Sequence, residues 1–185
     1  YSEFAILFRG NHQSRPLEKE LQLLKIPYHI TGGTAFLDRG EVKDVLAWLR
    51  IIANPDDDAA FLRAVTSPKR EVGAGSLEKL AQMAQHAHIP LSLAAQNSSY
   101  VNALSARPAA GLSEFMRLIV RLRAQSKSAK AADIVRAVIA ESGILGQLRL
   151  ETKNEALFLR RKENLDELAQ WFEAERRPSG AGDLA

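Results

Sequence analysis

The hydrophobic and polar positions divide the chain into a short alternating beginning and a long helical remainder. Residues 4–9 form an apolar run that ends at polar and glycine positions, which predicts a buried strand. Residues 13–25 place Leu17, Leu21 and Leu24 on one side, which predicts a helix. Residues 28–30 predict a second strand after Pro27. Strand, helix and strand in this order predict a β-α-β unit whose strands join a parallel sheet. Because two short strands form no stable sheet alone, we expect the other strands outside this chain or missing.

From Gly40 onward the apolar positions recur at helical spacing, so the rest of the chain is predicted to be mainly α. Asn54, Pro55 and Asp56 break the first of these helices and supply a cap for the next. Gly111 is expected to precede a strongly amphipathic helix. The predicted helices cover residues 41–53, 56–65, 76–87, 112–123, 131–141 and 153–177, with a short helical stretch between 90 and 97. Residues 67–75 are predicted to be a loop, and residues 178–185 a linker or frayed end.

Composition narrows the classes of protein that fit. The 185 residues are 46% hydrophobic and 25% charged, as in globular domains, and correspond to one large or two small domains. The net charge of +3 is too weak to indicate nucleic-acid binding, so any basic function must come from local clusters. The lack of cysteine excludes disulfides, cysteine-based zinc sites and thiol catalysis. No apolar run is long enough to span a membrane. Because the chain enters a predicted strand almost at once from Tyr1, we expect it to be a piece of a longer protein.

The first candidate site follows the first predicted strand, at the sheet edge where ligands bind in open α/β folds. Arg9 and Arg15 are able to pair with phosphates. Asn11 and Ser14 are able to cap the following helix or to hydrogen-bond a nucleotide. The alternative is an ordinary helix-capping turn with solvated arginines, which the spacing alone favours.

The second candidate site is the segment from Thr66 to Ser76. A glycine-containing turn that leads into a helix presents free backbone N–H groups, and the helix dipole favours a phosphate there. Lys69 and Arg70 precede this helix start, and neutralising phosphates would add affinity. The alternative is a capped loop with exposed basic residues. The charge of Glu71 opposes a phosphate.

The remaining polar clusters predict no catalytic centre. Asp56, Asp57 and Asp58 suggest a metal site, but helix capping explains them more simply. His86 and His88 are two positions apart, so they do not share a helix face. Residues 160–162 are expected to form solvated ion pairs with nearby acids. The chain has no phosphate-loop motif, no nucleophile elbow and no cofactor fingerprint, so nothing supports independent catalysis.

Several stretches together resemble the UvrD/Rep/PcrA helicases of superfamily one, and details of two of them resemble the Rep branch. The stretches are AILFRGNHQSR (5–15), IPY (26–28), GGTAF (32–36), EVKD (41–44), AWLR (47–50), NPDD (54–57), PKREVG (68–73) and RKENLDEL (161–168). The dense match covers residues 4–80, and a weaker match covers residues 155–172. Glu71 departs from the family, in which many members carry glycine at this point.

The resemblance implies a division of the chain. Residues 1–36 would be part of the RecA-like motor subdomain 2A, and residues 37–177 would be the helical insertion called subdomain 2B. The expected fold is therefore mainly α, a helical 2B-type domain with a small N-terminal β-α-β stub from an α/β motor domain. In the family this insertion swivels about its hinges and modulates unwinding. The hinges are expected near residues 34–39 and beyond Arg177.

The resemblance also implies the activity and the site residues. The parent would be an ATP-dependent 3′-to-5′ DNA helicase of the bacterial cytoplasm that uses ATP and Mg²⁺ in replication or repair, while this chain alone would bind no cofactor and be inactive. Single-stranded DNA contacts are expected at Arg9, Asn11 and Ser14. Duplex-backbone contacts are expected at Lys43, Thr66, Lys69, Arg70, Gly73, Gly75 and Ser76. Two alternatives remain open, a module that binds replication or repair proteins and the corresponding region of a helicase–nuclease.

Overall fold

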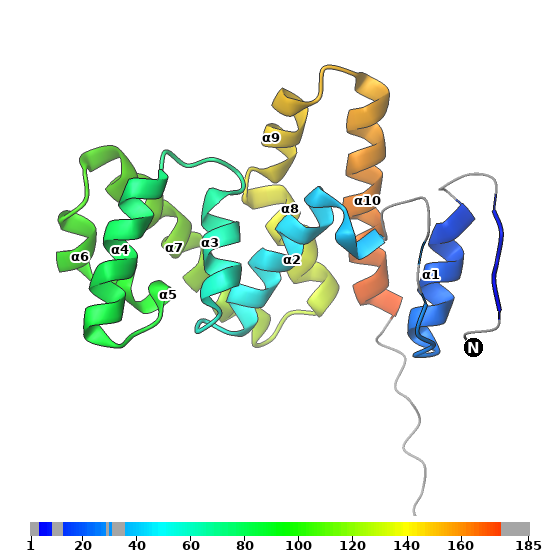
Figure 1. Cartoon of the computed structure of the whole chain (residues 1–185), viewed down its shortest axis with the longest axis horizontal. Helices are drawn as coiled ribbons and strands as arrows, with labels where there is room; N and C mark the ends of the chain where they lie inside the picture. Colours follow the sequence, from blue (N-terminus) through cyan, green and yellow to red (C-terminus); the bar gives the residue numbers. More distant parts are fainter. Residues whose placement is uncertain (1–3, 9–12, 29, 31–35, 175–185) are drawn as a thin grey trace, which may run out of the picture.

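The computed structural model describes residues 4–8, 13–28, 30 and 36–174, and in this part the chain is helical. Figure 1 shows α4 and α6 at one end of the molecule, α2 and α8 in the middle, and α10 and α1 toward the other end. The elements are α1 (Ser14–Leu23), η2 (Phe36–Asp38), α2 (Gly40–Ala53), α3 (Asp58–Thr66), α4 (Ala74–Ala87), α5 (Leu91–Ala94), α6 (Ser98–Asn102), α7 (Ala106–Ser126), α8 (Ala131–Glu141), α9 (Ile144–Glu151) and α10 (Glu155–Ala174).

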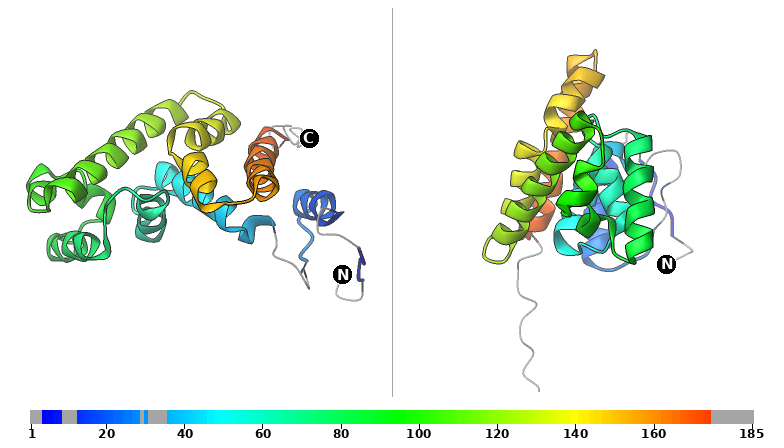
Figure 2. Two further views of the ribbon diagram at one scale, coloured as in Figure 1. Left: turned by 90° about the horizontal axis from the view of Figure 1, so that it is seen from above. Right: turned by 90° about the vertical axis from the view of Figure 1, so that its left-hand side faces the viewer.

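The buried core is built around α2, which packs against α3, α7, α8 and α10. Val42, Val45 and Trp48 of this helix are fully buried, as the helical spacing predicts. The Trp48 ring meets Phe115 of α7 edge to face with centroids 5.0 Å apart, and Phe115 meets Phe61 of α3 in the same way at 5.6 Å. These rings join three helices at the centre of the domain. Figure 2 shows the same packing from two further sides.

The beginning of α2 is tied to α10 by a buried polar cluster. Asn164, which is 3% exposed, donates from Nδ2 to Oε1 of Glu41 at 2.6 Å. Its Oδ1 accepts a hydrogen bond from the Arg39 guanidinium at 2.9 Å. The packing brings together residues more than 120 positions apart in the chain. This packing joins the beginning of the helical domain to its last helix, and it places residues 161–168 beside the start of α2.

The predicted β-α-β stub is only partly present. Its helix forms as α1, but residues 4–8 and the described Tyr28 and Ile30 adopt no strand; His29 lies outside the described residues. A strand needs a hydrogen-bonded neighbour, and the described residues offer none. Leu7 is accordingly 94% exposed, although its apolar run predicted burial. Of the expected stub, the described residues therefore form only the helix, whose Glu18 carboxylate accepts the Phe36 N–H at 2.7 Å.

Most helices form where the periodicity predicts them, with four corrections. α6 forms at residues 98–102, where no helix was predicted. α7 begins at Ala106 rather than Leu112 and runs through Gly111. α9 was missed, because Ser142 and Gly143 were expected to end all regular structure before residue 153. α4 begins at Ala74, so Gly75 and Ser76 lie inside its first turn. α8 has the predicted bounds, and α3 has the predicted aspartate cap, supplied by Asp57 rather than Asp56.

Candidate nucleic-acid interface

The turn between α3 and α4, residues 67–73, is held to α2 at its beginning. The Ser67 hydroxyl donates to Oδ2 of Asp44 at 2.7 Å. The Ser67 carbonyl accepts from Nε1 of Trp48 at 3.0 Å, so the buried indole satisfies its polar atom on the turn. On the other side, the backbone N–H of Lys69 donates to Oε1 of Gln147 on α9 at 2.8 Å. The turn is therefore fixed from two sides rather than free in solvent.

Arg70 holds the middle of this turn from within. Its guanidinium donates to the carbonyls of Pro68 at 2.6 Å and Ala64 at 3.1 Å, and to the Ser142 carbonyl at the α8–α9 corner at 2.7 Å. The same group lies 4.7 Å from the ring centroid of Trp48. Cation–π contact and three carbonyl acceptors suit the planar fork of arginine. Arg70 thus positions the turn, and its donors point inward.

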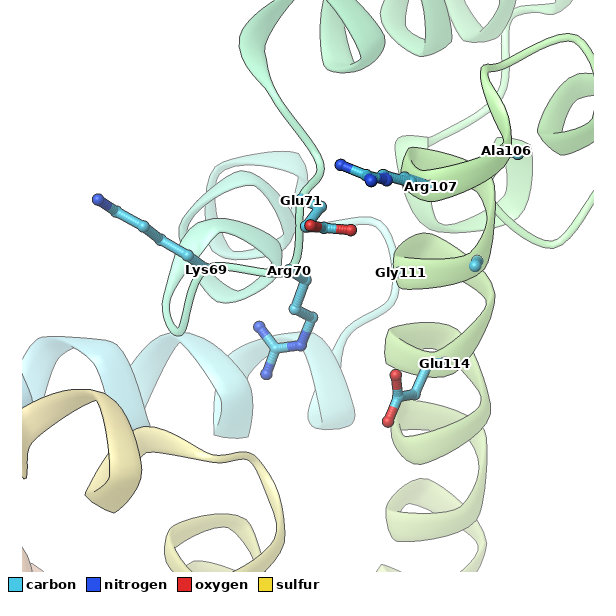
Figure 3. Close-up of a pocket in the computed structure, with 8 residues that line it drawn as sticks. Lys69, Arg70, Glu71, Ala106, Arg107, Gly111 and Glu114 are labelled. Atoms are coloured by element: carbon cyan, nitrogen blue, oxygen red, sulfur yellow. The ribbon is translucent and has the colours of Figure 1, made fainter. Parts of the chain in front are cut away.

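The electrostatics of Arg70 fit this role. Burial lowers the pKa of Arg70 to about 10, and the nearby charge of Glu114 raises it in part. The group therefore stays protonated at neutral pH, where its charge is satisfied by carbonyls and aromatic faces. Lys69 differs, because its side chain is exposed and extends away from Arg70 (Figure 3).

The start of α4 follows directly after the turn. Gly73 is its N-cap in extended conformation, and a glycine supplies no capping side chain for the first N–H groups. A Cβ on Gly73 or Gly75 would meet no atom within 4 Å, and neither residue has a positive φ. The fold itself therefore does not demand glycine at either position. Glycine is a favoured N-cap residue, and the missing Cβ atoms leave the helix start open to close approach by another backbone.

A surface cavity of about 500 Å³ is lined by the turn and by the first half of α7. Lys69, Arg70 and Glu71 line it from the turn, and Arg107 and Glu114 line it from α7. Figure 3 shows the Arg107 guanidinium extending from α7 toward Glu71, opposite to Lys69. The exposed positive charges of Lys69 and Arg107 therefore flank one exposed carboxylate.

The structure brings together only some of the residues predicted to contact DNA. Lys69, Arg70 and the glycines at the start of α4 lie in one stretch. Thr66 ends α3 and donates its hydroxyl to the Leu62 carbonyl at 2.8 Å. Lys43 lies on α2, pairs with Asp38 at 2.8 Å and does not line the cavity beside Lys69. Ser14 is only 5% exposed, which does not suit a contact with single-stranded DNA. Arg9 and Asn11 lie outside the described residues.

Arg107 was missed by the sequence reasoning. It lies in the first turn of α7, a turn that was expected to be loop. A signal was present, because Ser105 is a good helix cap and Pro108 is tolerated in a first helical turn. Gln147 was missed as well, since its position in α9 was not predicted to be helical.

Other polar groups behave as the simpler interpretation predicts. Asp57 accepts the Ala60 N–H at 2.9 Å, and Asp58 accepts the Leu91 N–H at 2.8 Å, so both act in capping and loop packing. Lys162 and Asp166 form an exposed pair one turn apart, 2.9 Å between charged atoms. Among the described residues no cluster of histidines and acids could hold a metal ion. None of the helices in the described residues has the length and apolar character of a membrane span.

Comparison with known proteins gives a consistent result. A family model described as the UvrD-like helicase C-terminal domain matches residues 1–179. ATP-dependent DNA helicase Rep of Escherichia coli is 39% identical over 175 residues, 93% of this chain and 25% of that protein. ATP-dependent DNA helicase PcrA of Bacillus subtilis is 39% identical over 166 residues, 90% and 22% respectively. DNA helicase II of Escherichia coli is 38% identical over 167 residues. The chain spans about a quarter of the length of these relatives, and the similar identities indicate the family rather than a branch within it.

Proposed function

The chain belongs to the UvrD-like helicase C-terminal domain family, and on that basis we propose that it is the DNA-contacting, regulatory region of a Rep-like ATP-dependent 3′-to-5′ DNA helicase. The observation that carries this proposal is the turn 67–73, clamped from inside by Arg70, which leads into a helix start without a side-chain cap. The bacterial sources of the relatives support a role on DNA in the bacterial cytoplasm.

The proposed contact is with the phosphate backbone of duplex DNA. The first N–H groups of α4 offer donors for one phosphate, and the helix dipole adds to their attraction. Lys69 supplies an exposed charge on the turn that precedes them, and Arg107 supplies a second from across the cavity. Such contacts position a protein on DNA without reading the bases. Arg70 takes part as a positioning residue, because its guanidinium is occupied by carbonyls.

The parent protein would supply the motor. The 185 residues contain no phosphate-loop sequence, so we expect the parent's ATP and Mg²⁺ site to depend on other parts of the protein. We therefore expect neither ATP hydrolysis nor unwinding from the chain alone. A single-strand contact at Arg9 and Asn11 remains part of the proposal, as do the division at residues 36/37 and hinge motion of the helical domain. DNA-stimulated ATPase activity from this chain would contradict the assignment of the motor to other parts of the parent.

The first test measures binding of a fluorescein-labelled 20-base-pair duplex by fluorescence anisotropy. Charge reversal of Lys69 or of Arg107 to Glu should weaken binding at least five-fold and reduce the slope of log affinity against log salt by about 1. Lys130→Glu is the matched control, because Lys130 is exposed and lies near the far end of α7, on the order of 30 Å from Arg107 by helix rise. Equal effects of all three reversals would mean that the field of the whole protein, not this turn, attracts DNA.

The second test uses the glycines. Gly75→Ala places a methyl group where the structure has open space and improves helix propensity, so thermal stability should stay the same or rise. If a phosphate approaches this backbone closely, the same variant should bind the duplex several-fold more weakly. Gly146→Ala, another open helical position, is the control for the substitution itself. Unchanged duplex affinity of Gly75→Ala would remove the helix start from the proposed contact.

A further inference from the structure

A second groove lies between the C-terminal part of α2, the short helix α5 and the second half of α7. Its volume is about 290 Å³. Ile51 of α2 and Met116 and Ile119 of α7 are buried beneath it and form an aliphatic floor. Val120 stands on the rim and is 51% exposed, whereas Leu112, Ile119 and Leu122 of the same helix are buried. The accessible apolar surface of the groove is therefore supplied chiefly by Val120, above a buried floor.

The charged side chains that line this groove are both positive. Arg123 and Lys127 lie one turn apart on α7, and no acidic residue is part of the lining. Within the described part of the chain neither cation forms an ion pair. Pro55 also lines the groove, and the next residue, Asp56, is exposed. The charge carried by the lining itself is therefore positive.

The groove and the proposed DNA contact lie on different sides of α7. Residues 107, 111 and 114 of this helix face the turn, whereas residues 116, 120, 123 and 127 face the groove. At 100° per residue the two sets are separated by about half a turn of the helix. A ligand in the groove therefore does not compete for space with DNA at the turn.

We propose that this groove binds an acidic peptide segment of a partner protein, with one bulky apolar side chain on the aliphatic floor and carboxylates at Arg123 and Lys127. The inference goes beyond the proposed DNA contact and does not depend on it. Charge complementarity selects the acidic peptide, and the aliphatic floor selects its apolar anchor. Single-stranded DNA is disfavoured, because the lining contains no aromatic side chain on which a base could stack.

The test titrates the full chain into a fluorescein-labelled peptide, SDEELFDDS, and follows anisotropy at low and moderate salt. The expected dissociation constant is on the order of 10–100 μM and rises with salt, as for a small, partly charged interface. The peptide SKKKLFKKS and the peptide SDEEGSDDS, which lacks the apolar anchor, should each bind at least ten-fold more weakly.

Three variants locate the binding. The double reversal R123E/K127E should weaken the acidic peptide at least ten-fold, and Val120→Ser about three-fold. Arg117→Glu is the matched control, because Arg117 is an exposed arginine of the same helix outside the groove and should change affinity less than two-fold. Thermal melts establish that each variant is folded.

The proposal is overturned if the acidic peptide fails to bind at 1 mM, if the lysine peptide binds equally well, or if R123E/K127E loses no more affinity than Arg117→Glu. It is also overturned if a 12-nucleotide single strand, and not the peptide, loses affinity in the double reversal, since the groove would then bind nucleic acid. Duplex binding at Lys69 is measured in the same variants. If R123E/K127E loses the peptide but still binds the duplex, the peptide site and the DNA contact are shown to be separate.

Discussion

Gly111 is the position where a single added methyl group should do the most damage. A Cβ built there would lie 2.1 Å from the carbonyl oxygen of Arg70 and 3.3 Å from its carbonyl carbon. Carbon–oxygen contacts between packed segments are normally 3.3 Å or longer, so either α7 or the turn must move by about 1 Å. The obstructing atom is backbone, and the turn is held by Arg70 on the Ser142 carbonyl at 2.7 Å. Relief by rotating a flexible side chain is therefore not available.

The expected magnitude combines two opposing effects. Overpacking of this kind costs about 1–3 kcal/mol, with the higher values where backbone must shift. Replacing glycine by alanine inside a helix returns up to about 1 kcal/mol. We expect Gly111→Ala to lower the free energy of unfolding by about 2 kcal/mol. For a chain of this length that corresponds to a fall in Tm of about 4–8 °C.

Thermal unfolding followed by circular dichroism measures this effect, and Gly146→Ala is the matched control. Gly146 lies in the first turn of α9 with no atom within 4 Å of its missing Cβ. The control variant should keep or slightly raise Tm, because only helix propensity changes. A Tm of Gly111→Ala that equals or exceeds that of the control would refute the close packing of α7 on the turn.

Three further predictions concern the turn 67–73 and Asp57, the N-cap of α3. Arg70→Lys should lower the free energy of unfolding, measured in urea, by about 2 kcal/mol, because the lysine ammonium cannot reach the three carbonyls that the planar guanidinium bonds. Unchanged stability would show that these hydrogen bonds do not hold the turn. Glu71 has a φ of 59°, so Glu71→Gly should raise stability by up to about 1 kcal/mol whereas Glu71→Gln should not. Both variants should strengthen duplex binding by removing a negative charge, and anisotropy that detects no gain in either would contradict this. The Ala60 N–H and the Arg50 guanidinium lower the pKa of Asp57 below 3.8, so its cap stabilises the fold above that pH and is lost as pH falls through the lowered pKa. Asp57→Ala should therefore have a lower Tm than the wild type at pH 7, and this difference in Tm should vanish in acid. Asp57→Asn should keep much of the cap at every pH. A difference in Tm between Asp57→Ala and the wild type that does not change with pH would contradict the role of the Asp57 carboxylate as the cap.

Local pattern predicted much of the helical domain. The apolar positions in residues 131–141 predicted the bounds of α8, because a helix that buries one face in the core carries apolar residues at helical spacing. The cap before α3 was readable because capping depends on residues within three positions, although Asp57 supplies it rather than the predicted Asp56. The family resemblance also rested on short local stretches, and the family match over residues 1–179 confirms it.

Two of the errors arise because the deciding contact lies far away in the chain. Gly111 looked like a helix breaker, but it is inside α7 because the Arg70 carbonyl occupies the place of a Cβ. The apolar run at residues 4–8 predicted a strand, but a strand depends on a neighbour that the described residues do not supply.

The sequence by itself therefore determined most of the helical segments, the family and the stretch in which we predicted a phosphate contact. Only the tertiary structure decided the roles within that stretch. Lys69 and Arg70 are adjacent cations with the same local signal, yet one extends into solvent and the other bonds Ser142, 72 positions later. Arg107 joins them because α7 begins earlier and packs across the turn. Charge and propensity act over a few residues, whereas burial depends on which distant segments pack together.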